Sequence, residues 1–199
     1  MKAFETTVDL EIKRLLQHKN YPCLAALQSY HRKDYWLKAY ENFGEHDQRP
    51  ELREDLLNYL DEYKKSSSPY FTFWAVFKDV NNLDEDQFEI NMWRELSSLK
   101  SIDSQQFDSN PAFSDDPSSK NFCFSIGGHA FFVVGLHPAS SRLSRRFPWP
   151  ALVFNTYEQF DSVELNPMVG LYADLWESVQ FSGKKNEPGW RYPFQLRGV

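Results

Sequence analysis

The chain has few cysteines and no long apolar run. Cys23 and Cys123 are the only cysteines among 199 residues, so we do not expect disulfides to stabilise the fold. No apolar stretch approaches the roughly 20 residues that cross a bilayer. The N-terminal stretch, MKAFETTVDLEIKRLL, mixes charges and lacks the apolar core of a signal peptide. We therefore expect a cytoplasmic protein with no membrane-spanning segment.

The sequence also lacks an excess of positive charge and the familiar short catalytic motifs. Its formal net charge is −6 and its pI is near 5.4. Both values argue against nucleic acid as the main partner, because neutralising phosphates requires a broad basic surface. The chain contains no P-loop, dinucleotide-binding glycine fingerprint, HExxH, CxxC or GxSxG.

Apolar and aromatic side chains are plentiful by contrast. Hydrophobic residues make up 41% of the chain and aromatic residues 17%. The length is sufficient for one well-buried domain, and we expect a single domain over residues 1–199. So many aromatic rings suit a packed core, and also a site that encloses a flat apolar ligand.

Four stretches show the spacing of amphipathic helices. The fourth begins with a predicted capping box, in which Asp84 and Gln87 satisfy the first backbone N–H groups. Each apolar stripe is interpreted as a core-facing surface. The four stretches are 3–18, 20–36, 52–63 and 84–99.

Strands are predicted in the remaining apolar stretches. Residues 122–126 and 129–136 flank Gly127-Gly128, which is typical of a two-residue hairpin turn, and 70–77 and 151–154 are further strands. The combination predicts an α+β fold, with a mainly antiparallel sheet flanked by helices. The polar residues 101–121 are predicted to form a mobile loop or lid over a pocket.

The most informative stretch is HPASSRLSRRF, at the exit of the 129–136 strand. His137 ends that strand, where a side chain can face a cleft or can instead satisfy the turn. His129 lies on the same face of the strand, but about 26 Å away, so the two rings cannot ligate one metal ion.

Three arginines follow His137 within nine residues. A helical turn capped by Ser140 or Ser141 would place Arg142, Arg145 and Arg146 on one face. Guanidinium groups beside a helix N-terminus favour carboxylate or phosphate. The alternative is that these arginines pair with carboxylates of the protein itself.

Several segments together resemble the YqcI/YcgG family. They are YPC, FTFWAVF, FSIGGHAFFVVGLHPASSRLSRRF, LVFNTYEQF, NPM and QFSGK…GWRYPF, between about residues 20 and 195, and HPxSSRxxRRF is the most specific. The chain departs from the family pattern at Lys184, where arginine is expected, and at Tyr192, where cysteine is expected. The segment between EQF and NPM is also shorter than expected.

The resemblance implies a haem-dependent monooxygenase. Characterised members are similar to enzymes of the guanitoxin and cycloserine pathways that N-hydroxylate a guanidino group. Haem b needs an axial iron ligand, for which His137 is the first candidate, Cys23 the second and Cys123 the third. The cationic turn, comprising Ser140, Ser141, Arg142, Arg145 and Arg146, would hold the propionates.

The implied substrate is a small guanidine or amine, oxidised with O2 or peroxide and, where needed, an electron donor. A carboxylate should pair with such a cation, and Glu158 or Asp161 is nearest in sequence to the cationic turn, while the Asn155 amide could orient the substrate. Two other functions stay open. The protein could bind or sense haem without catalysis, or could bind an anionic metabolite without haem.

Overall fold

The computed structural model describes residues 2–18, 21, 23–45, 49–66, 68–78, 83–119 and 121–159. The helices are α1 (Lys2–Leu16), α2 (Leu24–Arg32), α3 (Pro50–Lys65) and α4 (Glu85–Asp103). The strands are β1 (Tyr35–Tyr40), β2 (Thr72–Phe77), β3 (Phe124–Ile126), β4 (His129–Leu136) and β5 (Ala151–Thr156). Within these ranges no helix is both long and apolar enough to span a bilayer.

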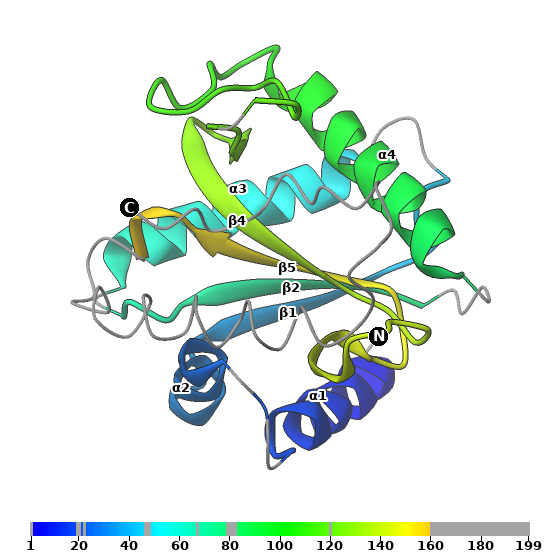
Figure 1. The fold of residues 1–199 in the computed structure, drawn as a ribbon. Coiled ribbons are helices and arrows are strands. Elements are labelled where there is room, and N and C mark those ends of the chain that lie inside the picture. Colours follow the sequence, from blue (N-terminus) through cyan, green and yellow to red (C-terminus); the bar gives the residue numbers. More distant parts are fainter. Residues whose placement is uncertain are drawn as a thin grey trace.

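The five strands form one open sheet in the order β1-β2-β5-β4-β3. Only β1 and β2 run parallel, and the other three pairs are antiparallel. Figure 1 shows α3 and α4 over one face of the sheet and α1 and α2 over the other. The prediction of an α+β fold with a mainly antiparallel sheet flanked by helices is confirmed.

Each face of the sheet has its own apolar core. Along β4, Phe131 and Val133 pack toward α3 and α4, whereas Val134 and Leu136 pack toward α1 and α2. This alternation follows from the two-residue period of a strand. Every residue of β2 is buried because helices cover both faces at that strand.

The hairpin and the capping box are both confirmed. Gly127 and Gly128 adopt φ values of +58° and +75° between β3 and β4, the left-handed conformation that such a turn requires. At the start of α4 the Gln87 backbone N–H donates to Asp84 at 2.8 Å. The Gln87 side chain accepts from the Asp84 N–H at 3.2 Å.

The helix predicted to start within residues 20–36 is present, but it ends before that stretch does. The helix stops at Arg32, Lys33 takes a left-handed conformation with φ of +59°, and Tyr35–Tyr40 forms β1. The edge strand β1 is only half-buried along most of its length and pairs in parallel with β2, which lies more than thirty residues further along the chain. Local spacing carries no information about such distant pairing.

The polar loop begins later than expected, because α4 takes up residues 101–103. The Asn110 N–H donates to Ser125 Oγ at 3.3 Å, and the Phe113 ring packs edge-on against Tyr157 with centroids 4.6 Å apart. The loop therefore has anchors on β3 and on the end of β5. Whether it moves as a lid stays a prediction.

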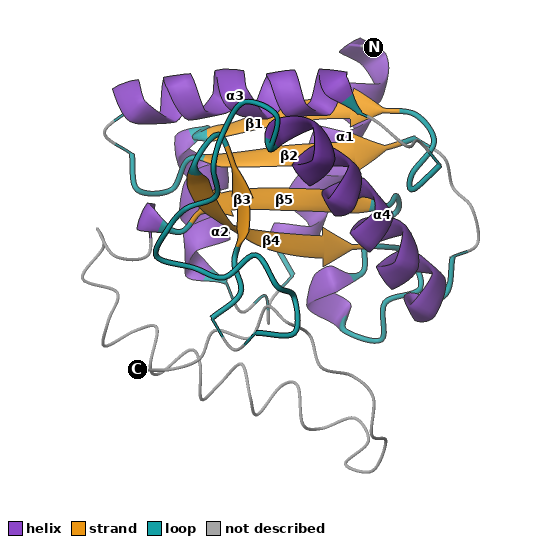
Figure 2. Ribbon diagram, turned by 90° about the horizontal axis from the view of Figure 1, so that it is seen from above, coloured by secondary structure: helices purple, strands orange, loops and turns teal. Residues whose placement is uncertain are grey.

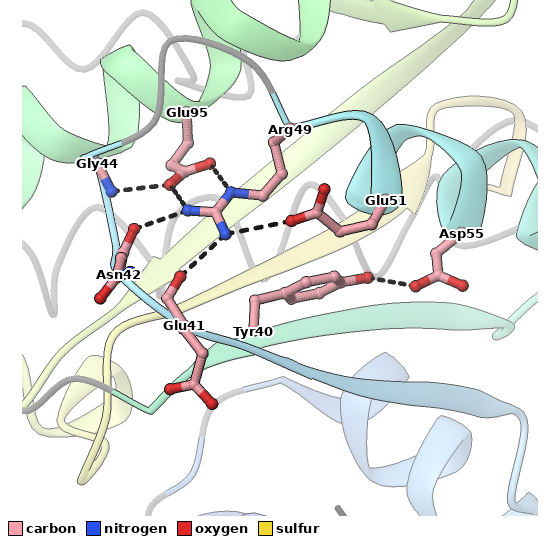
Figure 3. A network of polar contacts seen from close by, with 8 residues as sticks. All are labelled: Tyr40, Glu41, Asn42, Gly44, Arg49, Glu51, Asp55 and Glu95. Carbon is pink, nitrogen blue, oxygen red and sulfur yellow. Dashed lines mark hydrogen bonds and ion pairs between the residues drawn. The ribbon is translucent and has the colours of Figure 1, made fainter.

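A buried ion pair joins the chain after β1 to α4 (Figure 3). The Arg49 guanidinium donates to both carboxylate oxygens of Glu95, from Nε at 2.9 Å and from Nη2 at 2.7 Å. Its remaining N–H groups donate to the carbonyls of Glu41 and Asn42, and the Gly44 N–H donates to Glu95. Because both side chains are almost fully buried, this set of bonds holds an irregular segment against α4.

Candidate functional site

His137 follows the last residue of β4 and lies on the sheet face covered by α4. Its side chain is buried, and its ring stacks on Phe88 with centroids 4.4 Å apart and planes inclined by 15°. The His137 N–H donates to the Arg145 carbonyl at 3.1 Å, and its carbonyl accepts from the Phe147 N–H at 3.2 Å. Figure 2 shows α4 passing close to the end of β4.

The His137 ring has an unused polar atom. Its Nδ1 is fully buried and has no hydrogen-bond partner among the described residues. Burial lowers the pKa of His137, and the nearby carboxylates of Glu85 and Asp84 partly oppose this effect. A buried nitrogen without a partner is costly and marks a position where a ligand could bind.

A small, partly enclosed cavity of about 60 Å³ lies beside this ring. It brings together the first half of α4, the second half of β4 and the turn that follows. The described residues that line it are Glu85, Phe88, Glu89, Met92, Phe132, Val133, Gly135, His137, Ser140, Arg142 and Arg145. The polar loop begins at the opposite end of α4, so these lining residues do not place it over the cavity.

The three arginines do not share a helical face. Only Leu143–Arg145 forms a short 3-10 turn, and Arg142 and Arg146 flank it with extended backbones. Arg142 and Arg145 line the cavity, whereas the Nε of Arg146 donates to the Ser140 carbonyl at 2.9 Å. The chain must return into β5 soon after this turn, which leaves no room for the expected helix.

The two serines differ in what they contact. Ser140 is buried, lines the cavity and accepts the Arg142 N–H at Oγ, 3.3 Å away. Ser141 donates to one oxygen of Glu85 from its N–H at 2.9 Å and from its hydroxyl at 2.8 Å. Ser141 therefore attaches the turn to the first residue of α4, and neither side chain caps the 3-10 turn.

The structure does not bring Asn155 and Glu158 to His137. Glu158 lies near the start of β4, where its carboxylate is 3.1 Å from Nδ1 of His129, about 26 Å along the strand from His137. Asn155 alternates with Phe154 on β5 and so points to the sheet face opposite His137, where its amide donates to the Phe132 carbonyl. Asp161 lies outside the described residues.

Cys23 caps α2 and lies on the other side of the sheet. Its sulfur accepts the Ala26 N–H at 3.5 Å. Burial raises the pKa of Cys23, while that N–H and the positive charge of Arg145 partly lower it. Arg145 is thus near Cys23 as well as in the His137 cavity.

Cys123 is a structural thiol. It is buried, its S–H donates to the Phe131 carbonyl at 3.3 Å, and burial raises its pKa to about 11. A thiol held neutral in this way is a poor metal ligand. Among the described residues, no three His, Cys, Asp or Glu side chains gather as a metal centre.

Sequence reasoning missed the part of this site that comes from α4. Phe88 and Met92 belong to the apolar stripe of the helix predicted over residues 84–99, and they pack in the core but also line the cavity. Glu85 carries no local signal beyond its place in an acidic first turn, and Glu89, one turn further along α4, carries none. The contact between α4 and the end of β4 is tertiary, and nothing in either segment alone indicates it.

Comparison with models of known protein families assigns the chain to one of them. A model of the YqcI/YcgG family matches residues 12–166, which include β4, the cationic turn and the α4 residues of the cavity. The chain belongs to the YqcI/YcgG family. Neither the curated proteins nor the solved structures provide a match. The YqcI/YcgG assignment covers the whole His137 cavity and names no reaction for it.

Gly135→Ala is expected to disturb the Phe88–His137 stack. A Cβ at Gly135 would come within 2.7 Å of the Phe88 ring and 3.3 Å of the Met92 sulfur. Phe88 is also stacked on Phe43 at 5.2 Å, so the ring has little room to withdraw. We expect a loss of about 1–3 kcal/mol in the free energy of unfolding.

Urea unfolding of Gly135→Ala, Phe88→Leu and the double variant measures this effect. The smaller leucine should accept the new methyl group, so the double variant should lose less than the sum of the two single losses. Strict additivity would show that residue 135 does not contact the Phe88 ring.

Acidification is expected to destabilise the fold through His137. Burial holds the folded-state pKa below the ordinary value of 6.5, so the unfolded chain takes up the proton first as the pH falls. Stability should therefore decrease from about pH 6.5 downward. Urea midpoints of ligand-free protein at several pH values measure how steeply stability falls with pH. His137→Gln should make this dependence shallower. His18→Gln, which changes an exposed histidine, should leave it unchanged. An unchanged slope in His137→Gln would assign the effect to other groups.

Proposed function

We propose that this protein is a haem-dependent monooxygenase that N-hydroxylates a small guanidino or amino compound. The observation that carries the proposal is the buried Nδ1 of His137, which has no partner among the described residues. His137 lines the cavity together with Arg142 and Arg145. Membership of the YqcI/YcgG family supports the haem chemistry. When bound, haem b supplies the activation of O2 or peroxide, with electrons from a donor where O2 is used.

The donor set of the cavity fits haem. His137 offers a neutral imidazole, because burial lowers its pKa, and a neutral ring nitrogen is what iron binds. Arg142 and Arg145 would pair with the propionates, and the Ser140 hydroxyl lies beside them. Met92 and Val133 would provide an apolar wall that excludes water.

The cavity is too small to hold haem unless part of the structure moves. A space of about 60 Å³ is far below the roughly 300–1,000 Å³ of pockets that enclose drug-sized ligands. Phe88 stacks on both His137 and Phe43, so its ring cannot withdraw by itself. We propose that the first turns of α4 move outward together with this ring when haem binds. Asn155 and Glu158 have no part in this proposal, because both lie away from His137.

One observation favours a second candidate function. A cavity of this size, with two arginines and a buried serine, suits a small carboxylate or phosphate without any movement. The protein would then be a binding module for an anionic metabolite. A protein that binds haem without catalysing a reaction is a third candidate, intermediate between the monooxygenase and the anion-binding module.

An absorption spectrum of protein produced with haem supply separates these functions. A Soret band that persists through purification supports haem binding, and its absence in haem-replete protein contradicts the monooxygenase proposal. Incubation with arginine and simple guanidines, together with a reductant or peroxide, tests the reaction. A product heavier by one oxygen is expected, and bound haem without any oxidised product would leave the haem-binding function alone.

A further inference from the structure

Glu89 is the carboxylate of the His137 cavity that the fold does not use. Glu85, the other carboxylate of the cavity, accepts two hydrogen bonds from Ser141. Glu89 is half-buried, and its carboxylate makes no hydrogen bond or ion pair with the described residues. A partly desolvated carboxylate without a partner favours a cationic ligand, since pairing offsets the cost of burial.

Glu89 also borders a second, larger space. A shallow hollow of about 510 Å³, largely open to solvent, lies along α4, and Glu89 is shared between it and the His137 cavity. The described residues lining the hollow lie at helical spacing on one face of α4: Asp86, Glu89, Ile90, Trp93, Arg94 and Ser97. Glu89 therefore stands between an open surface and the buried imidazole.

The chemistry of this hollow suits an organic cation. Trp93 lies one helical turn from Glu89, and its ring packs on Phe122 with centroids 6.0 Å apart, which fixes its orientation. Ile90 is 53% exposed and adds apolar surface. A cation with a short apolar chain could contact the Trp93 face while it pairs with Glu89.

We propose that Glu89 binds the cationic nitrogen group of the substrate and that Trp93 forms the apolar wall beside it. Glu89 then takes the role that sequence proximity assigned to Glu158. The inference rests on the proposed function for the statement that the bound cation is the substrate. Binding of the cation itself is independent of haem.

Butylguanidinium and butylurea are matched probes, because they share a chain and differ in charge. Isothermal titration of both, with haem-loaded and haem-free protein, measures the preference for the cation. The unaltered protein should bind butylguanidinium more tightly, and Glu89→Gln should weaken this binding by about 10- to 100-fold with little effect on butylurea. Glu89→Asp retains the charge and should keep most of the preference.

Two control variants show whether the effect is specific. Glu54→Gln removes an exposed carboxylate of α3 and should leave the preference unchanged. Glu158→Gln tests the competing assignment and should also leave it unchanged. The inference is overturned if Glu89→Gln keeps the preference, or if Glu158→Gln alone removes it.

The haem-free titration separates this inference from the proposed function. A preference that depends on Glu89, in protein that shows no Soret band even when haem is supplied, would support the cation site and contradict the monooxygenase. A Soret band without any such preference would contradict the cation site and leave haem binding intact.

Discussion

Replacing Glu95 by alanine is expected to lower the free energy of unfolding by about 3–5 kcal/mol. The substitution leaves the Arg49 guanidinium, which is 1% exposed, without the carboxylate that accepts two of its hydrogen bonds. Only the exposed carboxylate of Glu51, 3.6 Å from Nη1, would still pair with this buried charge, and a poorly compensated buried charge is among the most costly single changes in a folded protein. Urea unfolding followed by circular dichroism measures the loss.

Two comparisons identify the cause of that loss. Glu62 forms an exposed ion pair with Lys65 on α3, and Glu62→Ala should cost less than about 1 kcal/mol. The double variant Arg49→Met with Glu95→Leu removes both charges and should be more stable than Glu95→Ala alone. If Glu95→Ala costs no more than Glu62→Ala, the pair is not buried as described.

Replacing His137 by alanine is expected to abolish or strongly shift the Soret band of haem-supplied protein. The side chain provides the buried ring nitrogen proposed as the iron ligand, and alanine has no atom that could replace it. Absorption spectra of variant and unaltered protein, both produced with haem supply, measure the change. Circular dichroism of the variant verifies that the fold is retained.

His129→Ala is the matched control. His129 lies on the same strand and pairs with Glu158 at the opposite end, so its loss should leave the Soret band intact. Cys23→Ser tests the second candidate ligand. A normal spectrum in His137→Ala, together with a lost band in Cys23→Ser, would assign the iron to Cys23 and contradict the role of His137.

Features that depend on neighbouring residues could be predicted. The Gly127-Gly128 turn and the Asp84 capping box need only residues within a few positions of each other, and both are present in the structure. The two-residue alternation of β4, which local sequence shows, puts His137 on the same face as Val133, and both lie on the α4 side of the sheet. Features that depend on pairing between distant segments could not be predicted from the sequence. Strand β1 is the clearest case, because its partner β2 comes from another part of the chain.

Some features of the candidate site could likewise be predicted from the sequence, and others depend on tertiary packing. The sequence by itself determined that a histidine, two serines and three arginines follow a buried strand, and its motifs indicated the YqcI/YcgG family. Only the tertiary structure decided which of these side chains meet. Packing of α4 on β4 brought Phe88 and Glu89 to His137, and the two-residue alternation of β5 turned Asn155 to the opposite face. Glu158 is close to His137 in sequence and far from it in space, because β4 and β5 run antiparallel and carry the two residues to opposite ends of the sheet.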